Sequence, residues 1–298
     1  MNNSTIFNKL STIYAATLDN NKRYQLKLKA LLIPDAIKLL KSPEYSQSYD
    51  AFINDTYIYR GDNSISIHAA EVIPGKRKSE NTYNVYTRLF SDILPSWKQY
   101  PKRNRSFICS TNFVYAKSYV NRDLNVYYML PKNDITIGVC SNDDIWGSFP
   151  MLREYDIRSL NSFVSDFIRL LTLFTNMDRI DTVNIFDHGS TQKVKSLLND
   201  IEYAIKKYDG NDEWINSNLE ADQFNRYIVT TLKNNPDLSL ISLLDKSLLN
   251  PVANKFKLLN NITELSTIGQ DSREIWFSGQ CLMVSSEIVT IIKKQLKD

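Results

Sequence analysis

Three short fragments of the sequence place side chains that can do chemistry at the ends of strands. In TYIYRGD (56–62), Arg60 ends an aromatic strand and Gly61 follows it. A guanidinium there offers a planar fork of donors that matches phosphate oxygens, and a glycine lets the backbone approach a ligand closely. A surface arginine before a turn glycine has the same pattern, so this fragment alone does not define a site.

The other two fragments supply hydroxyls and a carboxylate. In RSFICSTNF (105–113), Ser110 and Thr111 stand where a strand meets the next element. They either cap a helix that starts near Asn112 or hold a carboxylate or a ribose hydroxyl. In SREIWFSG (272–279), Glu274 opens a strongly apolar strand, so it is either exposed at a sheet edge or used in a site.

Several common chemistries are disfavoured by composition. The chain has two histidines and three cysteines without CxxC spacing, which argues against His-based catalysis, disulfide frameworks and zinc sites. It contains no GxxxxGK[ST] or GxGxxG motif and only eight glycines, which disfavours a glycine-rich nucleotide cradle. Any chemistry must therefore run on Arg, Ser, Glu and aromatic side chains.

The order of the three fragments resembles the Arg–Ser–Glu, cholera-toxin-like class of ADP-ribosyltransferases. The resemblance covers roughly 51–150 and 255–290, and it includes a strand–loop–strand stretch at 126–149. The matching positions are Tyr59-Arg60-Gly61, Ser110-Thr111-Asn112 followed by Phe113 and Ala116, and Glu274-Ile275-Trp276-Phe277 with Gly279.

The resemblance implies a role for each catalytic position. Arg60 would steady the NAD phosphates or the adjoining ribose, and Gly61 would present backbone groups to the nicotinamide amide. Ser110 would orient Glu274. Glu274 would bond the 2′-hydroxyl of the nicotinamide ribose and stabilise the oxocarbenium-like transition state as nicotinamide leaves. NAD would be the substrate, and no metal is required.

The resemblance also implies further contacts. Thr111 would help to hold NAD, and Phe113 and Tyr119 would offer ring faces to nicotinamide, although core packing is an alternative for them. Ser272 stands where members that modify protein arginines usually carry Glu or Gln. It is therefore assigned to the acceptor, which we expect to be a protein or a nucleic acid, with arginine disfavoured.

The periodicity of apolar residues predicts the elements that position these side chains. Residues 5–50 look helical, 51–150 contain short alternating β-rich runs, 155–250 return to the helical period, and the tail is strand-like before a last helix. This pattern predicts an α+β fold with a split β-sandwich ADP-ribosyltransferase-like core at 51–154 and 251–298. An N-terminal helical segment at 1–50 would precede the core, and a helical insertion at 155–250 would interrupt it.

A basic segment is the second feature with a functional interpretation. The net charge is only +3, but 75–105 carries eight cations against two anions. Interleaved aromatics can stack bases, so the segment is either a surface that meets nucleic acid or a solvated face with core aromatics. The alternatives to a transferase are therefore a non-catalytic nucleic-acid-binding module and a degenerate transferase fold.

The cellular setting is predicted only by analogy. No apolar run approaches the ~18 residues of a membrane span, and the N-terminus lacks the order of a secretory signal, which predicts a cytoplasmic protein without a membrane partner. A composition rich in Asn, Lys and Ile fits a bacteriophage or toxin–antitoxin effector acting in the host cytoplasm. An antitoxin or inhibitor would then be a possible partner.

Overall fold

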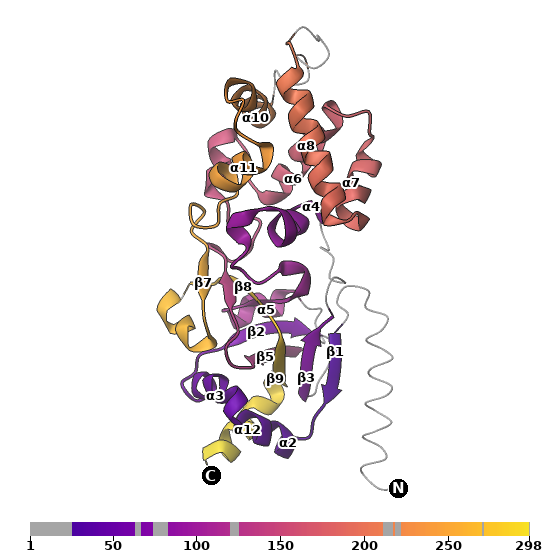
Figure 1. Cartoon of the computed structure of the whole chain (residues 1–298). Coiled ribbons are helices and arrows are strands. Elements are labelled where there is room, and N and C mark those ends of the chain that lie inside the picture. The colour runs from indigo at the N-terminus through magenta and orange to yellow at the C-terminus, as the bar shows by residue number, and fades with distance from the viewer. Residues whose placement is uncertain are drawn as a thin grey trace. The chain divides into compact units, whose positions relative to one another are not determined.

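The computed structural model describes residues 26–62, 67–73, 83–119, 125–210, 217, 222–269 and 271–297. The chain divides into two compact units (Figure 1). Unit 1 comprises Met1–Lys78, Arg103–Val139 and Leu258–Asp298, and unit 2 comprises Ser79–Lys102 and Cys140–Lys257. The three fragments with candidate chemistry all belong to unit 1, although they are far apart in sequence.

Unit 1 is built around a sheet. Its helices are α2 (Ile33–Leu40), α3 (Ser46–Ile53), α5 (Phe113–Ser118) and α12 (Ser286–Lys297). The strands of the sheet are β1 (Leu26–Ala30), β2 (Ile58–Asp62), β3 (Ile67–Val72), β4 (Ser106–Ser110), β5 (Asn125–Pro131), β6 (Ile137–Val139), β7 (Lys257–Leu259), β8 (Glu274–Ser278) and β9 (Gln280–Ser285). Short 3₁₀ segments lie at Pro43–Tyr45, Arg103–Arg105 and Ile262–Ile268.

The described strands form one nine-stranded sheet in the order β1-β3-β9-β5-β2-β4-β8-β6-β7. Long antiparallel registers join most neighbours, but β2 and β4 share a single register pair, Tyr59 with Ser110. We call this weak junction the seam. It separates the group β1-β3-β9-β5-β2 from the group β4-β8-β6-β7.

Both faces of the sheet are buried along β9, which explains why Cys281, Leu282, Met283 and Val284 are apolar in succession. Along β9, Cys281 and Met283 join one core cluster, whereas Leu282 and Val284 join the other. Helices α2, α3 and α12 contribute to the second cluster. Alternate residues of the strand thus pack into two separate cores, one on each face of the sheet.

Unit 2 is helical. It contains α4 (Val85–Arg88), α6 (Leu160–Leu173), α7 (Arg179–His188), α8 (Thr191–Lys207), α10 (Gln223–Asn234) and α11 (Leu240–Leu243). Shorter helical segments lie at Leu89–Ile93, Pro95–Trp97, Pro150–Tyr155 and Leu244–Leu248. Five of the helices begin at a Ser or Asp whose side chain accepts a hydrogen bond from a first-turn amide, the caps being Ser159, Asp178, Ser190, Asp222 and Ser239.

The predicted α+β class is confirmed, with corrections to the predicted elements at 26–30 and 262–268. Residues 26–30, expected in a helix, form β1, because Leu26 and Leu28 alternate with lysines and pack on the first core cluster. Residues 262–268, expected to be strand-like, form a 3₁₀ segment. The described strands are connected in one sheet through the seam, and the split β-sandwich core stays a prediction. The first predicted helical stretch, at 6–18, lies outside the described residues.

Candidate active site

Ser110 and Glu274 lie directly opposite each other on neighbouring strands. The antiparallel register of β4 and β8 pairs Ser110 with Glu274. Side chains of directly opposed residues leave the same face of a sheet, with Cβ atoms about 4.5–5.5 Å apart. Both residues are nearly inaccessible, at 3% and 9% exposure. The hydroxyl and the carboxylate therefore occupy one buried place at the end of β4.

Arg60 lies next to this place, across the seam. It follows Tyr59, the residue that pairs with Ser110, and its Nη1 donates to the carbonyl oxygen of Ile108 on β4 at 2.7 Å. By alternation, Arg60 leaves β2 on the opposite face from Tyr59 and Ser110. Where two strands part, a side chain can enter between them, and the guanidinium of Arg60 bonds a backbone carbonyl of the parted strand.

The thiol of Cys109 is sensitive to both charged groups. Burial raises the pKa of Cys109 to about 12, the Arg60 guanidinium lowers it, and the Glu274 carboxylate raises it. Electrostatic effects of this kind require charges within several ångströms of the thiol. The structure thus places Arg60, Ser110 and Glu274 on three neighbouring strands, with the Arg60 side chain on the opposite face of the sheet from the other two. In the sequence, 214 residues separate Arg60 from Glu274.

Thr111 fastens the segment that leads into β8. Its backbone N–H donates to the Arg273 carbonyl at 3.0 Å, and its hydroxyl accepts from the Arg273 N–H at 2.9 Å and donates to the Asp271 carbonyl at 3.2 Å. The Thr111 hydroxyl, which the sequence assigned to NAD, is thus bonded to protein. These bonds fix the backbone directly before Glu274.

The helix cap that the sequence left open belongs to Asn112. Its side chain accepts from the Tyr115 N–H at 3.0 Å, and α5 begins at the next residue. The Ser110 hydroxyl oxygen accepts from the Asn112 N–H at 3.0 Å. A serine hydroxyl that accepts in this way still has its own proton to donate. Ser110 is therefore not the cap and can donate to a carboxylate.

The predicted aromatic contacts have different surroundings. The Phe113 ring is half-buried and meets Tyr59 edge-on, with centroids 5.6 Å apart. Tyr119 is 65% exposed, and its hydroxyl donates to the Tyr115 hydroxyl at 2.8 Å. Phe113 therefore packs against β2 beside the site, whereas Tyr119 presents a ring to solvent.

Gly61 and Ser272 flank the site. Gly61 pairs with Val126 inside the β2–β5 ladder, one residue beyond Arg60. Ser272 lies two residues before Glu274, and its hydroxyl is buried without a hydrogen-bond partner among the described residues. The structure thus encloses this hydroxyl in protein close to the acid.

Arg103 is the residue of the site that the sequence interpretation missed. It is 2% exposed, and its Nη2 lies 2.8 Å from the Glu274 Oε1. Its guanidinium carbon stands 5.1 Å from the centroid of the Trp276 ring. The sequence grouped Arg103 with the cations of the basic segment, and no local signal distinguished it, because its partner is 171 residues away.

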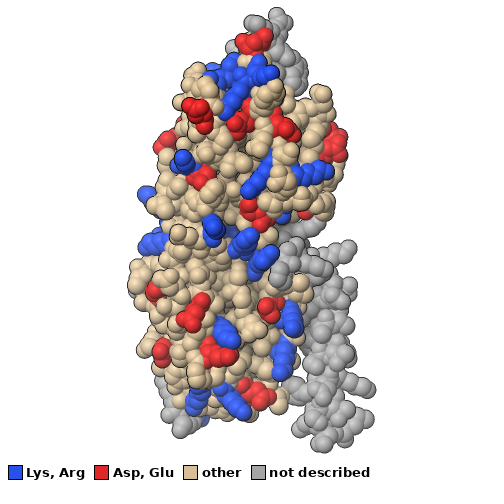
Figure 2. Space-filling view, viewed as in Figure 1, with Lys and Arg blue, Asp and Glu red and all other residues tan. Residues whose placement is uncertain are grey.

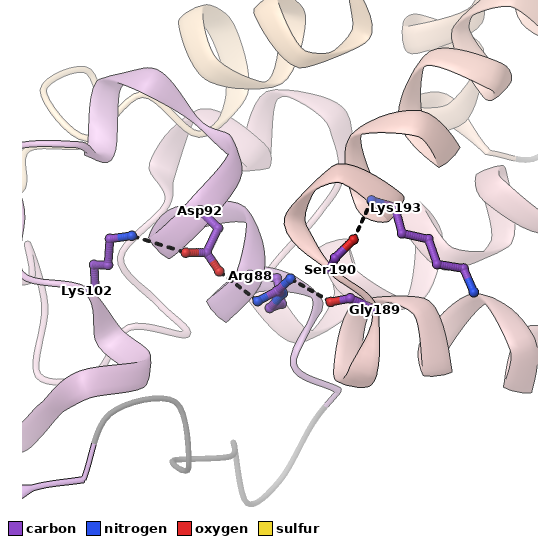
Figure 3. A network of polar contacts seen from close by, with 6 residues as sticks. All are labelled: Arg88, Asp92, Lys102, Gly189, Ser190 and Lys193. Carbon is purple, nitrogen blue, oxygen red and sulfur yellow. Dashed lines mark hydrogen bonds and ion pairs between the residues drawn. The ribbon is translucent and has the colours of Figure 1, made fainter.

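Several other residues of the basic segment are engaged within the protein. Figure 3 shows Arg88 and Lys102 both bound to Asp92, and Arg88 also donates to the Gly189 carbonyl at 2.9 Å. The aromatics that could have stacked bases are mostly core residues, with Tyr86, Phe90 and Trp97 at 1–4% exposure. Lys76, Arg77 and Lys78 lie outside the described residues. The core alternative is therefore correct for these three aromatics.

On the face drawn in Figure 2, Lys and Arg are interspersed with Asp and Glu. Among the described residues, no group of three or more His, Cys, Asp or Glu side chains can hold a metal ion. In the same residues, no helix combines the length and apolar character needed to cross a membrane.

Comparisons with known proteins add no identification. A scan against models of protein families and searches of curated proteins and of solved structures found no match. Function must therefore be inferred from the side chains of the site.

Proposed function

We propose that this protein is an NAD-dependent mono-ADP-ribosyltransferase that transfers ADP-ribose to a protein or nucleic acid. The observation that carries the proposal is the register of the three motif strands. Tyr59, next to Arg60, pairs with Ser110, and Ser110 pairs with Glu274. Motifs separated by up to 214 residues thus adjoin in the order in which the resemblance needs them.

In the proposed reaction, the bond between the ribose C1′ and the nicotinamide nitrogen breaks, and its electron pair leaves with nicotinamide. The ribose gains oxocarbenium character, and a nucleophile of the acceptor then attacks C1′ and loses its proton to water. Glu274 accepts a hydrogen bond from the ribose 2′-hydroxyl and places a fixed negative charge beside the developing positive charge. Ser110 donates to that carboxylate.

Arg60 and Gly61 would hold the substrate on the other side of the seam. The Arg60 guanidinium has five N–H donors in a planar fork, and Nη1 is bonded to Ile108. We assign the guanidinium to the NAD phosphates or the adjoining ribose, and the backbone of Gly61 to the nicotinamide amide. Phe113 and Tyr119 are assigned to the nicotinamide ring, and Thr111 supports the site by fixing the backbone before Glu274.

The acceptor is the least constrained part of the proposal. Ser272 presents a neutral hydroxyl two residues before Glu274, where an acid would attract a guanidinium. An acceptor without a positive charge, such as a nucleobase, a nucleic-acid end or another side chain, fits this position better than arginine.

A test uses NAD labelled in its adenylate phosphate, a cell lysate, and separate protein and nucleic-acid fractions. We expect label in one fraction with the wild-type protein, and a loss of about 10²–10³-fold in the rate with Glu274→Gln. Glu287→Gln is the matched control, because Glu287 is an exposed carboxylate in the first turn of α12. Equal labelling by wild type and Glu274→Gln would refute the proposal.

A degenerate transferase fold without chemistry is the second candidate. One observation favours it: Glu274 already has a buried cationic partner, Arg103, so the carboxylate has a structural role. The two candidates differ in ligand binding. A transferase should gain thermal stability in millimolar NAD, and a degenerate fold should not.

A further inference from the structure

Arg103 enters the site along the face of β8 that carries Glu274. Ser278, Trp276 and Glu274 alternate on this face, and their partners on β4 are Ser106, Ile108 and Ser110. Arg103 belongs to the 3₁₀ segment directly before β4, near the Ser278 end of this row. Its guanidinium therefore runs past Trp276, where the ring centroid is 5.1 Å away, before it bonds Glu274.

The tryptophan that supports the guanidinium is itself held in place. Trp276 is 0% exposed and pairs with Gly138 on β6. A Cβ on Gly138 would lie 2.3 Å from two atoms of the indole ring, so only glycine leaves the ring its place. Gly138 thus admits Trp276, Trp276 supports Arg103, and Arg103 bonds Glu274.

This arrangement is specific to arginine. A guanidinium is planar, stacks on an aromatic face and bonds a carboxylate in a fixed direction, whereas an ammonium is a point charge on a flexible stem. The bond from Nη2 to Oε1 restricts the rotation of the carboxylate. An exposed ion pair on the surface needs neither an aromatic face under the cation nor a fixed bond direction.

We propose that Arg103 is a positioning residue that holds the Glu274 carboxylate in the orientation that the ribose 2′-hydroxyl requires. The inference rests on the proposed transferase function. Arg103 does not contact NAD in this scheme, and it acts only through Glu274. On this inference, Arg103 belongs to the proposed catalytic centre, although the sequence grouped it with cations that could bind nucleic acid.

The scheme predicts a specific kinetic pattern in NAD cleavage, measured by nicotinamide release. Arg103→Met should lower kcat by about 10²-fold, because misplacing a catalytic group has effects of this size, and the KM for NAD should stay within about threefold. Because Arg103 acts through Glu274, the double variant Arg103→Met, Glu274→Gln should be no slower than Glu274→Gln alone. If Arg103 had only a structural role, the rate of nicotinamide release would fall in the single and the double variants in proportion to the fraction of protein that is folded.

Two further variants supply a fallback for Arg103→Met and a control. Arg103→Lys keeps the positive charge but loses the planar fork, and we expect its kcat to fall at least tenfold. This variant replaces Arg103→Met in the assay if Arg103→Met does not melt cooperatively. Arg105→Met, in the same 3₁₀ segment, is the control, because Arg105 is exposed.

The outcomes separate this inference from the proposed function. If the wild type releases nicotinamide and the Arg103 variants match Arg105→Met, the positioning role is wrong and the transferase stands. If the effects of Arg103→Met and Glu274→Gln multiply in the double variant, Arg103 acts independently of Glu274 and the inference is also wrong. If the wild type releases no nicotinamide, the proposed function fails and this role fails with it.

Discussion

Removal of one partner from the Arg103–Glu274 ion pair should destabilise the fold far more than removal of both. The two groups are 2.8 Å apart and their side chains are 2% and 11% exposed. With an effective dielectric constant near 20, the Coulomb attraction at that distance is roughly 6 kcal/mol. Desolvation of two buried ions offsets most of it, so the net value of the pair is small.

A single substitution leaves the other charge buried without its partner, which costs about 3–5 kcal/mol. We therefore expect Arg103→Met to lower the free energy of unfolding by this amount. Glu274→Gln should lie at the lower end, because the amide oxygen can still accept from Arg103. The double variant should lose at least about 2 kcal/mol less than the sum of the single losses.

The assay is urea unfolding followed by far-ultraviolet circular dichroism for the wild type, both single variants and the double variant. The exposed pair Lys132–Glu44 provides a matched cycle, with 3.0 Å between the charged atoms and side chains 38% and 60% exposed. Its coupling energy should be below about 1 kcal/mol. If the Arg103–Glu274 coupling is equally small, the pair is solvated and the reasoning about the site is wrong.

Three other predictions concern the surroundings of the site. Gly138→Ala should cost about 1–3 kcal/mol of stability because its Cβ would overlap Trp276; an unchanged thermal melt would show that the ring can move aside. Thr111→Val should lower the free energy of unfolding by about 1–2 kcal/mol and slow NAD cleavage, because it removes the hydroxyl that bonds Arg273. Thr111→Ser should restore both stability and cleavage, and equal stability of the Val and Ser variants would contradict this. Burial lowers the pKa of His68 below its usual 6.5, so the unfolded chain takes up the proton at a higher pH than the folded chain does. The contribution of His68 to stability should therefore be complete above about pH 6.5 and fall as the pH drops toward the pKa of the folded state. His68→Gln should therefore flatten the dependence of the urea midpoint between about pH 7 and 5, and an unchanged slope would exclude His68 as its source.

Local pattern was sufficient to predict the strands around the site. The runs at 56–62, 106–110 and 125–131 combine β-branched and aromatic residues with period-2 alternation, and each forms a strand. The helices of unit 2 likewise follow from 3.6-residue periodicity and from Ser or Asp caps, as at Ser159 and Ser190. Where one pattern dominates a segment, its structure could be read from the sequence.

The misses have physical causes. Residues 26–30 read as helical because LKLKA is followed by the helical run of α2, yet pairing with β3 makes them a strand. Periodicity also does not say which strands are neighbours, so the seam and the register between Ser110 and Glu274 were not predictable from it. Arg103 was misassigned for the same reason: a count of charges records the cation but not its buried partner.

The order of strands in the sheet has a consequence for the nascent chain. β9 lies between β3 and β5, and β8 lies between β4 and β6, although both come from the last segment of unit 1. The group that contains β8 cannot close until residue 278 has left the ribosome, and the group that contains β9 cannot close until residue 285 has. Sheets that depend on such distant pairings fold slowly. The sheet stays incomplete until its last two strands have been made, and the candidate acid arrives among the last residues needed to finish it.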